Sequence, residues 1–184
     1  MISVALSEAM ERSCLTIVAL AALITLIGGA GVRSAGAQCT PVVQHLVNDL
    51  ELDEARADTK AAIARNAKDD AALHCMGTIA LAANDPAGAA SWFDKAVNAN
   101  DQVALHHLWL ANALGEQAPT TNRFKLPFLA KRIKSEFDKA ATLDPGSVDA
   151  KHGLIQFYSR APSIMGGSME KVVAKMKFWL QDFF

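Results

Sequence analysis

The chain has 184 residues and a formal net charge of −1, so its overall charge favours neither nucleic acid nor a charged membrane as a partner. This length suffices for one domain plus a targeting segment. Apolar residues make up 51 % of the sequence, alanine is very frequent, and strand-forming residues are sparse after residue 40. This composition favours packed helices over sheets.

Residues 1–37 are predicted to form a secretory signal peptide. Leu15–Ile27 is an uncharged apolar run of 13 residues, which is shorter than the roughly 20 residues that span a bilayer. Ala35-Gly36-Ala37 follows as a small-x-small cleavage site, so we expect a periplasmic or secreted mature chain that begins at Gln38. The alternatives are an uncleaved anchor and a lipoprotein attached at Cys39, although Gln38 stands where a lipoprotein needs a small residue.

Two cysteines, Cys39 and Cys75, follow the predicted cleavage site. An exported compartment permits a disulfide between them. Cys75 also falls in a helical stretch rich in small residues, where a buried thiol is ordinary. We therefore favour two unpaired cysteines, with a disulfide as the alternative.

The mature chain is predicted to start with two helices, Val42–Leu50 and about Asp53–Asn66. The stretch Asp70–Asp101 then has the pattern of a helical hairpin, because each half carries one apolar stripe at helical period. The stripes are Leu73, Met76, Gly77 and Ala80, then Ala89, Phe93, Ala96 and Val97. Asp85 is the expected N-cap of the second helix, and Pro86 suits its first position.

The hairpin pattern recurs further along the chain. In the next predicted helix, about Gln102–Gly115, Leu110-Ala111 falls 34 residues after Met76-Gly77. Phe137-Asp138-Lys139-Ala140 then repeats Phe93-Asp94-Lys95-Ala96 after 44 residues, which indicates a ten-residue insertion near residues 117–126. Further helices are expected over residues 147–160 and after Ser168, which can cap the last one.

This pattern resembles the tetratricopeptide repeat (TPR), which has Leu-Gly or Leu-Ala in its first helix and Ala…Phe…Ala in its second. Met76-Gly77, Ala89, Phe93 and Ala96 match it, whereas Leu73, Ala80 and Asp101 replace the usual Trp, Tyr and Pro. The resemblance implies an all-α fold, an α-solenoid of about three TPR-like antiparallel helix pairs after the signal peptide. The expected repeats are at about 42–69, 70–103 and 104–147, with a partial or capping repeat at 148–184.

The sequence contains no strong signature of metal or catalytic chemistry. Its histidines lack the i, i+4 spacing of a helical zinc motif, and no C-x-x-C accompanies them. Gly166-Gly167-Ser168 lacks the residue order of a phosphate loop and is better explained as a turn, and no G-x-S-x-G elbow is present. We therefore predict no enzyme, no cofactor and no metal site. The five histidines of the chain are His45, His74, His106, His107 and His152.

Charged residues cluster by sign in two places. The acidic cluster lies in the first repeat and the basic cluster follows the insertion. Solvated helix faces explain both, and an anion-preferring patch that meets an acidic partner is the alternative for the basic one. The acidic cluster is Asp49, Glu51, Asp53, Glu54 and Asp58, and the basic cluster is Arg123, Lys125, Lys131, Arg132 and Lys134.

In TPR proteins the first helices of successive repeats line a concave groove that binds extended peptides or a partner's helix, so the resemblance implies such a groove here. We expect an exported, non-catalytic interaction or scaffolding module that binds a peptide or partner protein, without nucleic acid and without stable membrane insertion. The alternatives are a carrier of a metal or small molecule through groove histidines, and an accessory subunit of an envelope enzyme. The 34-residue register places these polar residues in the groove: His74, Thr78, Asn112, Glu116, His152, Gln156 and Arg160.

Overall fold

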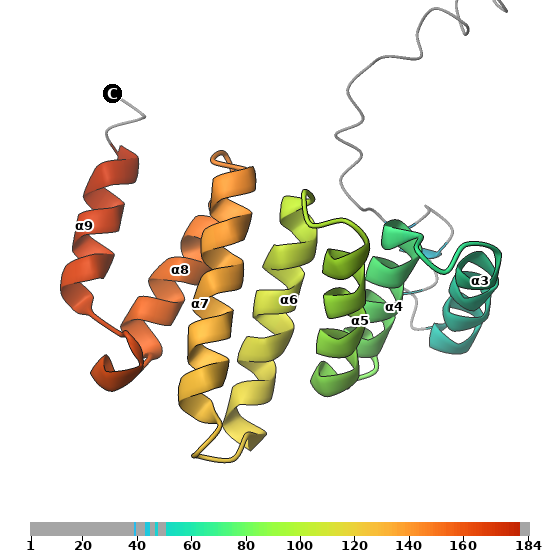
Figure 1. Cartoon of the computed structure of the whole chain (residues 1–184), viewed down its shortest axis with the longest axis horizontal. Coiled ribbons are helices and arrows are strands. Elements are labelled where there is room, and N and C mark those ends of the chain that lie inside the picture. The colour runs from blue at the N-terminus through green and yellow to red at the C-terminus, as the bar shows by residue number, and fades with distance from the viewer. Residues whose placement is uncertain (1–38, 40–42, 45–46, 48–50, 181–184) are drawn as a thin grey trace, which may run out of the picture. The chain divides into compact units, whose positions relative to one another are not determined.

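The structure is a computed structural model that describes residues 39, 43–44, 47 and 51–180 (Figure 1). The predicted signal peptide and its cleavage site lie outside the described residues, as does most of the predicted helix Val42–Leu50. The described residues all belong to one compact unit of the chain.

The described part of the chain is helical and contains no strand, which confirms the predicted all-α class. Figure 1 shows the helices following one another in chain order, each beside the next. Within this part, no helix is long and apolar enough to cross a membrane. The helices are α3 (Leu52–Arg65), α4 (Asp70–Ala82), α5 (Pro86–Ala99), α6 (Ala104–Gln117), α7 (Leu126–Leu143), α8 (Val148–Arg160) and α9 (Met169–Leu180), with short 3-10 turns η1 (Ala118–Thr120) and η2 (Ser163–Met165).

Each helix packs on its neighbours in sequence, from α3 with α4 through to α8 with α9. The most extensive interfaces join α4 with α5, α6 with α7, and α5 with α6. A chain in which each element contacts mainly its sequence neighbours is compatible with a helical repeat architecture.

Side-chain caps define where several of these helices begin. Asp85 accepts a hydrogen bond from the Gly88 N–H (2.8 Å), and Pro86 occupies the first turn of α5, as predicted. Asp69 caps α4 and Ser147 caps α8 in the same manner. Ser168 accepts a hydrogen bond from the Lys171 N–H (3.3 Å) at the start of α9, also as predicted. Each cap pairs an N–H that the helix itself leaves without a partner.

Two buried phenylalanines pack between neighbouring helices, Phe93 against the helix before its own and Phe137 against the helix after its own. Phe93 is fully buried, and its ring covers Gly77, where an added Cβ would lie 2.5 Å from the ring. Phe137 is buried likewise, and its ring covers Gly153, where a Cβ would lie 2.2 Å from it. The glycines therefore allow a close approach of α4 to α5 and of α7 to α8, because any larger residue would collide with the rings.

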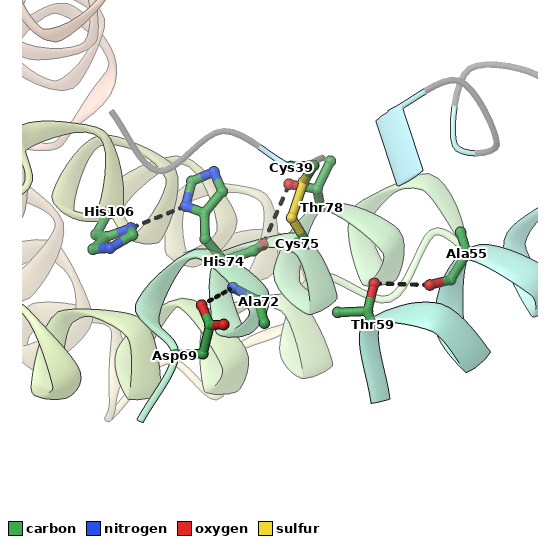
Figure 2. The surroundings of a disulfide bond; sticks show 9 residues. All are labelled: Cys39, Ala55, Thr59, Asp69, Ala72, His74, Cys75, Thr78 and His106. Atoms are coloured by element: carbon green, nitrogen blue, oxygen red, sulfur yellow. Dashed lines mark hydrogen bonds between the residues drawn. A yellow bond between two sulfur atoms is a disulfide. The ribbon is translucent and has the colours of Figure 1, made fainter. Parts of the chain in front are cut away.

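Cys39 and Cys75 form a disulfide, so the preference for unpaired cysteines is wrong. Figure 2 shows Cys75 on α4 bonded to Cys39. The pairing follows from packing, because Val43 and Val47 are buried in the same cluster as α4 residues Met76 and Ile79. Val43 and Val47 thus pack beside α4, and the Cα atoms of the two cysteines lie 5.3 Å apart. The spacing of 36 residues alone does not reveal it.

Candidate functional site: a groove lined by α6, α7 and α8

Four of the seven predicted groove residues line one groove of about 720 Å³. Asn112 and Glu116 reach it from α6, and Gln156 and Arg160 reach it from α8. These two helices are the first helices of successive predicted repeats, and the residues recur at matching places in them. The matching residues are 44 apart, which is the 34-residue period plus the ten-residue insertion.

The interior of the groove is apolar. Helix α7 contributes Leu129, Ile133 and Phe137, and α8 contributes Phe157. The predicted insertion supplies further lining residues, Ala118, Pro119 and Leu126, and the turn after α8 supplies Ala161, Pro162 and Met165. The sequence predicted the insertion as a loop but not its place in the groove.

The polar groups of the groove are suited to recognition. Asn112 is half-buried and has no hydrogen-bond partner among the described residues, so its amide can donate to and accept from a ligand. Gln156 has its Nε2 3.2 Å from Nε2 of His152, one turn earlier on α8. His152 itself does not line the groove, but it holds this amide in place. Glu116 and Arg160 are exposed, and the structure shows no ion-pair partner for either in the described residues.

Gly115 leaves part of the groove open. It lies on α6 between Asn112 and Glu116, and a Cβ added there would meet no atom within 4 Å. Gly77 and Gly153, by contrast, are covered by phenylalanine rings. A side chain introduced at residue 115 would therefore enter space that a ligand can occupy.

His74 and Thr78 are not part of this groove. His74 is 3 % exposed, and its Nδ1 lies 3.1 Å from Nδ1 of His106, toward which it points in Figure 2. His106 Nε2 lies 3.2 Å from an oxygen of Asp70. Because the carboxylate accepts, His106 donates from Nε2 and accepts at Nδ1 from the His74 N–H. Thr78 donates its hydroxyl to the His74 carbonyl oxygen (3.3 Å).

Burial keeps this histidine pair uncharged. Burial, followed by the neighbouring His106, lowers the pKa of His74 to about 3. Burial also lowers the pKa of His106, against the opposing effect of Asp70. Two neutral imidazoles and a carboxylate thus connect α4 to α6. Among the described residues, no group of three His, Cys, Asp or Glu side chains could hold a metal ion.

His107 has the opposite electrostatic setting. Its Nδ1 lies 2.7 Å from an oxygen of Glu136, and its Nε2 lies 3.0 Å from the Asp101 carbonyl oxygen. Both ring nitrogens thus face acceptors, which favours the imidazolium. Burial opposes this charge, but the hydrogen bonds to Glu136 and Asp101 outweigh it and raise the pKa of His107. This link between α6 and α7 was not predicted, because the two partners are 29 residues apart.

No protein-family model matches the chain, and no curated protein matches it with significant similarity.

Proposed function

We propose that this protein is an exported TPR-like interaction module, without catalysis of its own, that binds an extended peptide segment of a partner protein in the groove lined by α6, α7 and α8. The observation that carries the proposal is the convergence of the Asn112 and Gln156 amides on one apolar groove. Amide side chains can pair with the N–H and C=O groups of an extended backbone.

The size and lining of the groove favour a short segment. A volume of about 720 Å³ lies within the roughly 300–1,000 Å³ of ligand sites that enclose a small molecule. Leu129, Ile133 and Phe157 offer contacts to an apolar side chain of the peptide. Glu116 and Arg160 would then meet charges of opposite sign beside it.

Two observations support the repeat and the export. Phe93 and Phe137 lie 44 residues apart, which is the 34-residue period plus the ten-residue insertion, and both are buried between neighbouring helices. The Cys39–Cys75 disulfide suits an oxidising compartment, since cytosolic thiols are kept reduced.

The alternative of metal carriage through groove histidines has less support. His74 is buried against His106, and His152 contacts Gln156 without lining the groove. The second alternative is an accessory subunit of an envelope enzyme. It is a case of the same proposal in which the partner protein is an enzyme.

The test begins with short peptides selected on the purified protein from a displayed random library. Replacing Asn112 and Gln156 together by Ala should weaken binding of the selected peptides by about tenfold, which is roughly 1.4 kcal/mol. The free energy of unfolding should stay within about 0.5 kcal/mol of the wild type, because neither side chain is in the core. The control is Asn98→Ala, an exposed amide on α5 outside the groove.

A steric variant gives a second, independent readout. Gly115→Leu should abolish binding by filling the groove, and it should not destabilise the protein because glycine is unfavourable inside a helix. Ala61→Leu on the exposed face of α3 is the matched control. Unchanged binding by Gly115→Leu and by the double amide variant would refute the groove assignment.

A further inference from the structure

Two large apolar side chains are exposed near the start of α7, Phe124 just before the helix and Phe128 in its first turn. Phe124 is 79 % exposed and Phe128 is 78 % exposed, and they lie four residues apart. Phenylalanine is usually buried, and neighbouring exposed apolar residues often mark an interaction site. Neither ring is part of the hydrophobic core of the described residues.

Cations without ion-pair partners lie close to the two phenylalanines in the sequence. Arg123, Lys125 and Lys131 are exposed, and none has an ion-pair partner in the described residues, whereas Arg132 pairs with Asp94. Residues 117–132 include no Asp or Glu. The net charge of −1 for the whole chain therefore conceals a locally positive segment.

A hollow of about 660 Å³ lies beside Phe128. Its polar lining consists of amides, hydroxyls and the cations Lys125 and Arg132, and it contains no carboxylate. An anionic group could enter it while an apolar chain contacts Phe128. The other lining residues are Gln117, Thr120, Thr121, Asn122 and Leu129.

We propose that this segment, residues 117–132, docks the protein on an anionic phospholipid surface. Exposed aromatic rings can enter the boundary between headgroups and acyl chains while nearby cations attract anionic headgroups. In Figure 1 the connection from α6 to α7 extends beyond the ends of α5 and α8, and Phe124 belongs to this connection. Both rings are exposed, so they could contact a lipid surface.

The disulfide favours lipid over nucleic acid as the anionic partner. Cys39–Cys75 indicates an oxidising compartment, where a membrane is the abundant anionic surface. Leu129 lines both the hollow and the groove between α6, α7 and α8, so docking would hold a groove-bound peptide close to the membrane. The docking proposal does not depend on that peptide.

The experiment uses the full protein as it is purified from the cells that produce it. It measures the partition of this protein onto phosphatidylglycerol vesicles and onto phosphatidylcholine vesicles. Wild type should partition at least about tenfold more strongly onto the anionic vesicles, and added salt should weaken this. Phe124→Ser with Phe128→Ser, and separately Lys125→Glu with Lys131→Glu, should each reduce anionic partition by about tenfold. All four residues are exposed, so the melting temperature should not change.

Helix α9 supplies matched controls, because Phe178 and the lysines Lys175 and Lys177 lie outside this segment. Phe178→Ser, and Lys175→Glu with Lys177→Glu, should leave anionic partition unchanged. Equal partition onto both vesicle types, or equal loss in the α9 variants, would overturn the proposal. Displacement by soluble glycerol phosphate would indicate an anion pocket instead, and tighter binding of a polyglutamate peptide would indicate an acidic protein partner; either result rejects membrane docking.

Discussion

At the scale of single residues, Phe93 and Phe137 join neighbouring helices into one core. Phe93 also stacks on Trp109, with ring centroids 6.1 Å apart, so α4, α5 and α6 meet at its ring. We expect Phe93→Ala and Phe137→Ala each to lower the free energy of unfolding by about 3–5 kcal/mol, measured by urea denaturation. Domains of this size have only about 5–15 kcal/mol in total.

The exposed Phe124 provides the control for this prediction. Phe124→Ala should change the free energy of unfolding by less than about 0.5 kcal/mol, because the ring is 79 % exposed. Losses below about 1 kcal/mol in both core variants would contradict the register that makes Phe93 and Phe137 equivalent.

The buried pair His74 and His106 predicts how stability depends on pH. Its pKa values are lowered in the folded state, so below pH 6.5 the unfolded chain binds more protons and stability falls. For His74 the loss should continue to about pH 3, at up to roughly 1.4 kcal/mol per pH unit. His107 acts oppositely, because its raised pKa adds stability at low pH that is lost as pH rises through its folded value.

Removing one buried imidazole tests this dependence. His74→Gln should reduce the loss of stability between pH 6.5 and pH 4.5 by roughly one proton's contribution, about 1.4 kcal/mol per pH unit. Denaturation at several pH values measures it, with His152→Gln as the exposed control. An unchanged slope in His74→Gln would mean that this histidine is not neutral in the folded protein.

At the scale of helices, local sequence signals specify where the elements begin. Asp85→Ala should cost about 1 kcal/mol of unfolding free energy, because the Gly88 N–H loses its side-chain partner. Thermal or chemical denaturation measures it, with Asp58→Ala on the exposed face of α3 as the control. A loss no larger than that of the control would show that the cap contributes nothing.

The same scale shows what a sequence can and cannot predict. The Asp85-Pro86 cap, the apolar stripes and the all-α class were predictable, because they depend on residues within one or two turns of each other. The link from His74 to His106 joins residues 32 apart, and Glu136 meets His107 across an insertion. Those partners depend on how helices pack, which helical periodicity alone does not determine.

At the scale of the whole molecule, the disulfide bonds Cys39 to Cys75 of α4 across a separation of 36 residues. Reducing it should lower the free energy of unfolding by about 2–4 kcal/mol, mainly by releasing a constraint on the unfolded chain. The melting temperature with and without reductant measures this, and a Cys39→Ser variant should be unaffected by reductant. Equal melting temperatures for the oxidised and reduced wild type would contradict a stabilising role.

The groove shows what the repeat register predicts at this scale and what it does not. The repeat register predicted that Asn112, Glu116, Gln156 and Arg160 lie near one another, and they do line one groove. It could not predict that the insertion would help to line that groove, because insertions do not follow the repeat. The register also placed His74 at a surface, whereas His74 is buried. Its burial arises from contacts with α6, which the register does not predict.

The central claim is that the groove binds an extended peptide, and mapping a bound peptide by NMR tests it most directly. Isotope-labelled protein is titrated with a peptide selected from the displayed library, and amide shifts are followed. We predict the largest shifts at Gly115 and at the side-chain amides of Asn112 and Gln156, with small shifts along α3. Shifts centred on α3, or on the basic start of α7 with none at Gly115, would contradict the account.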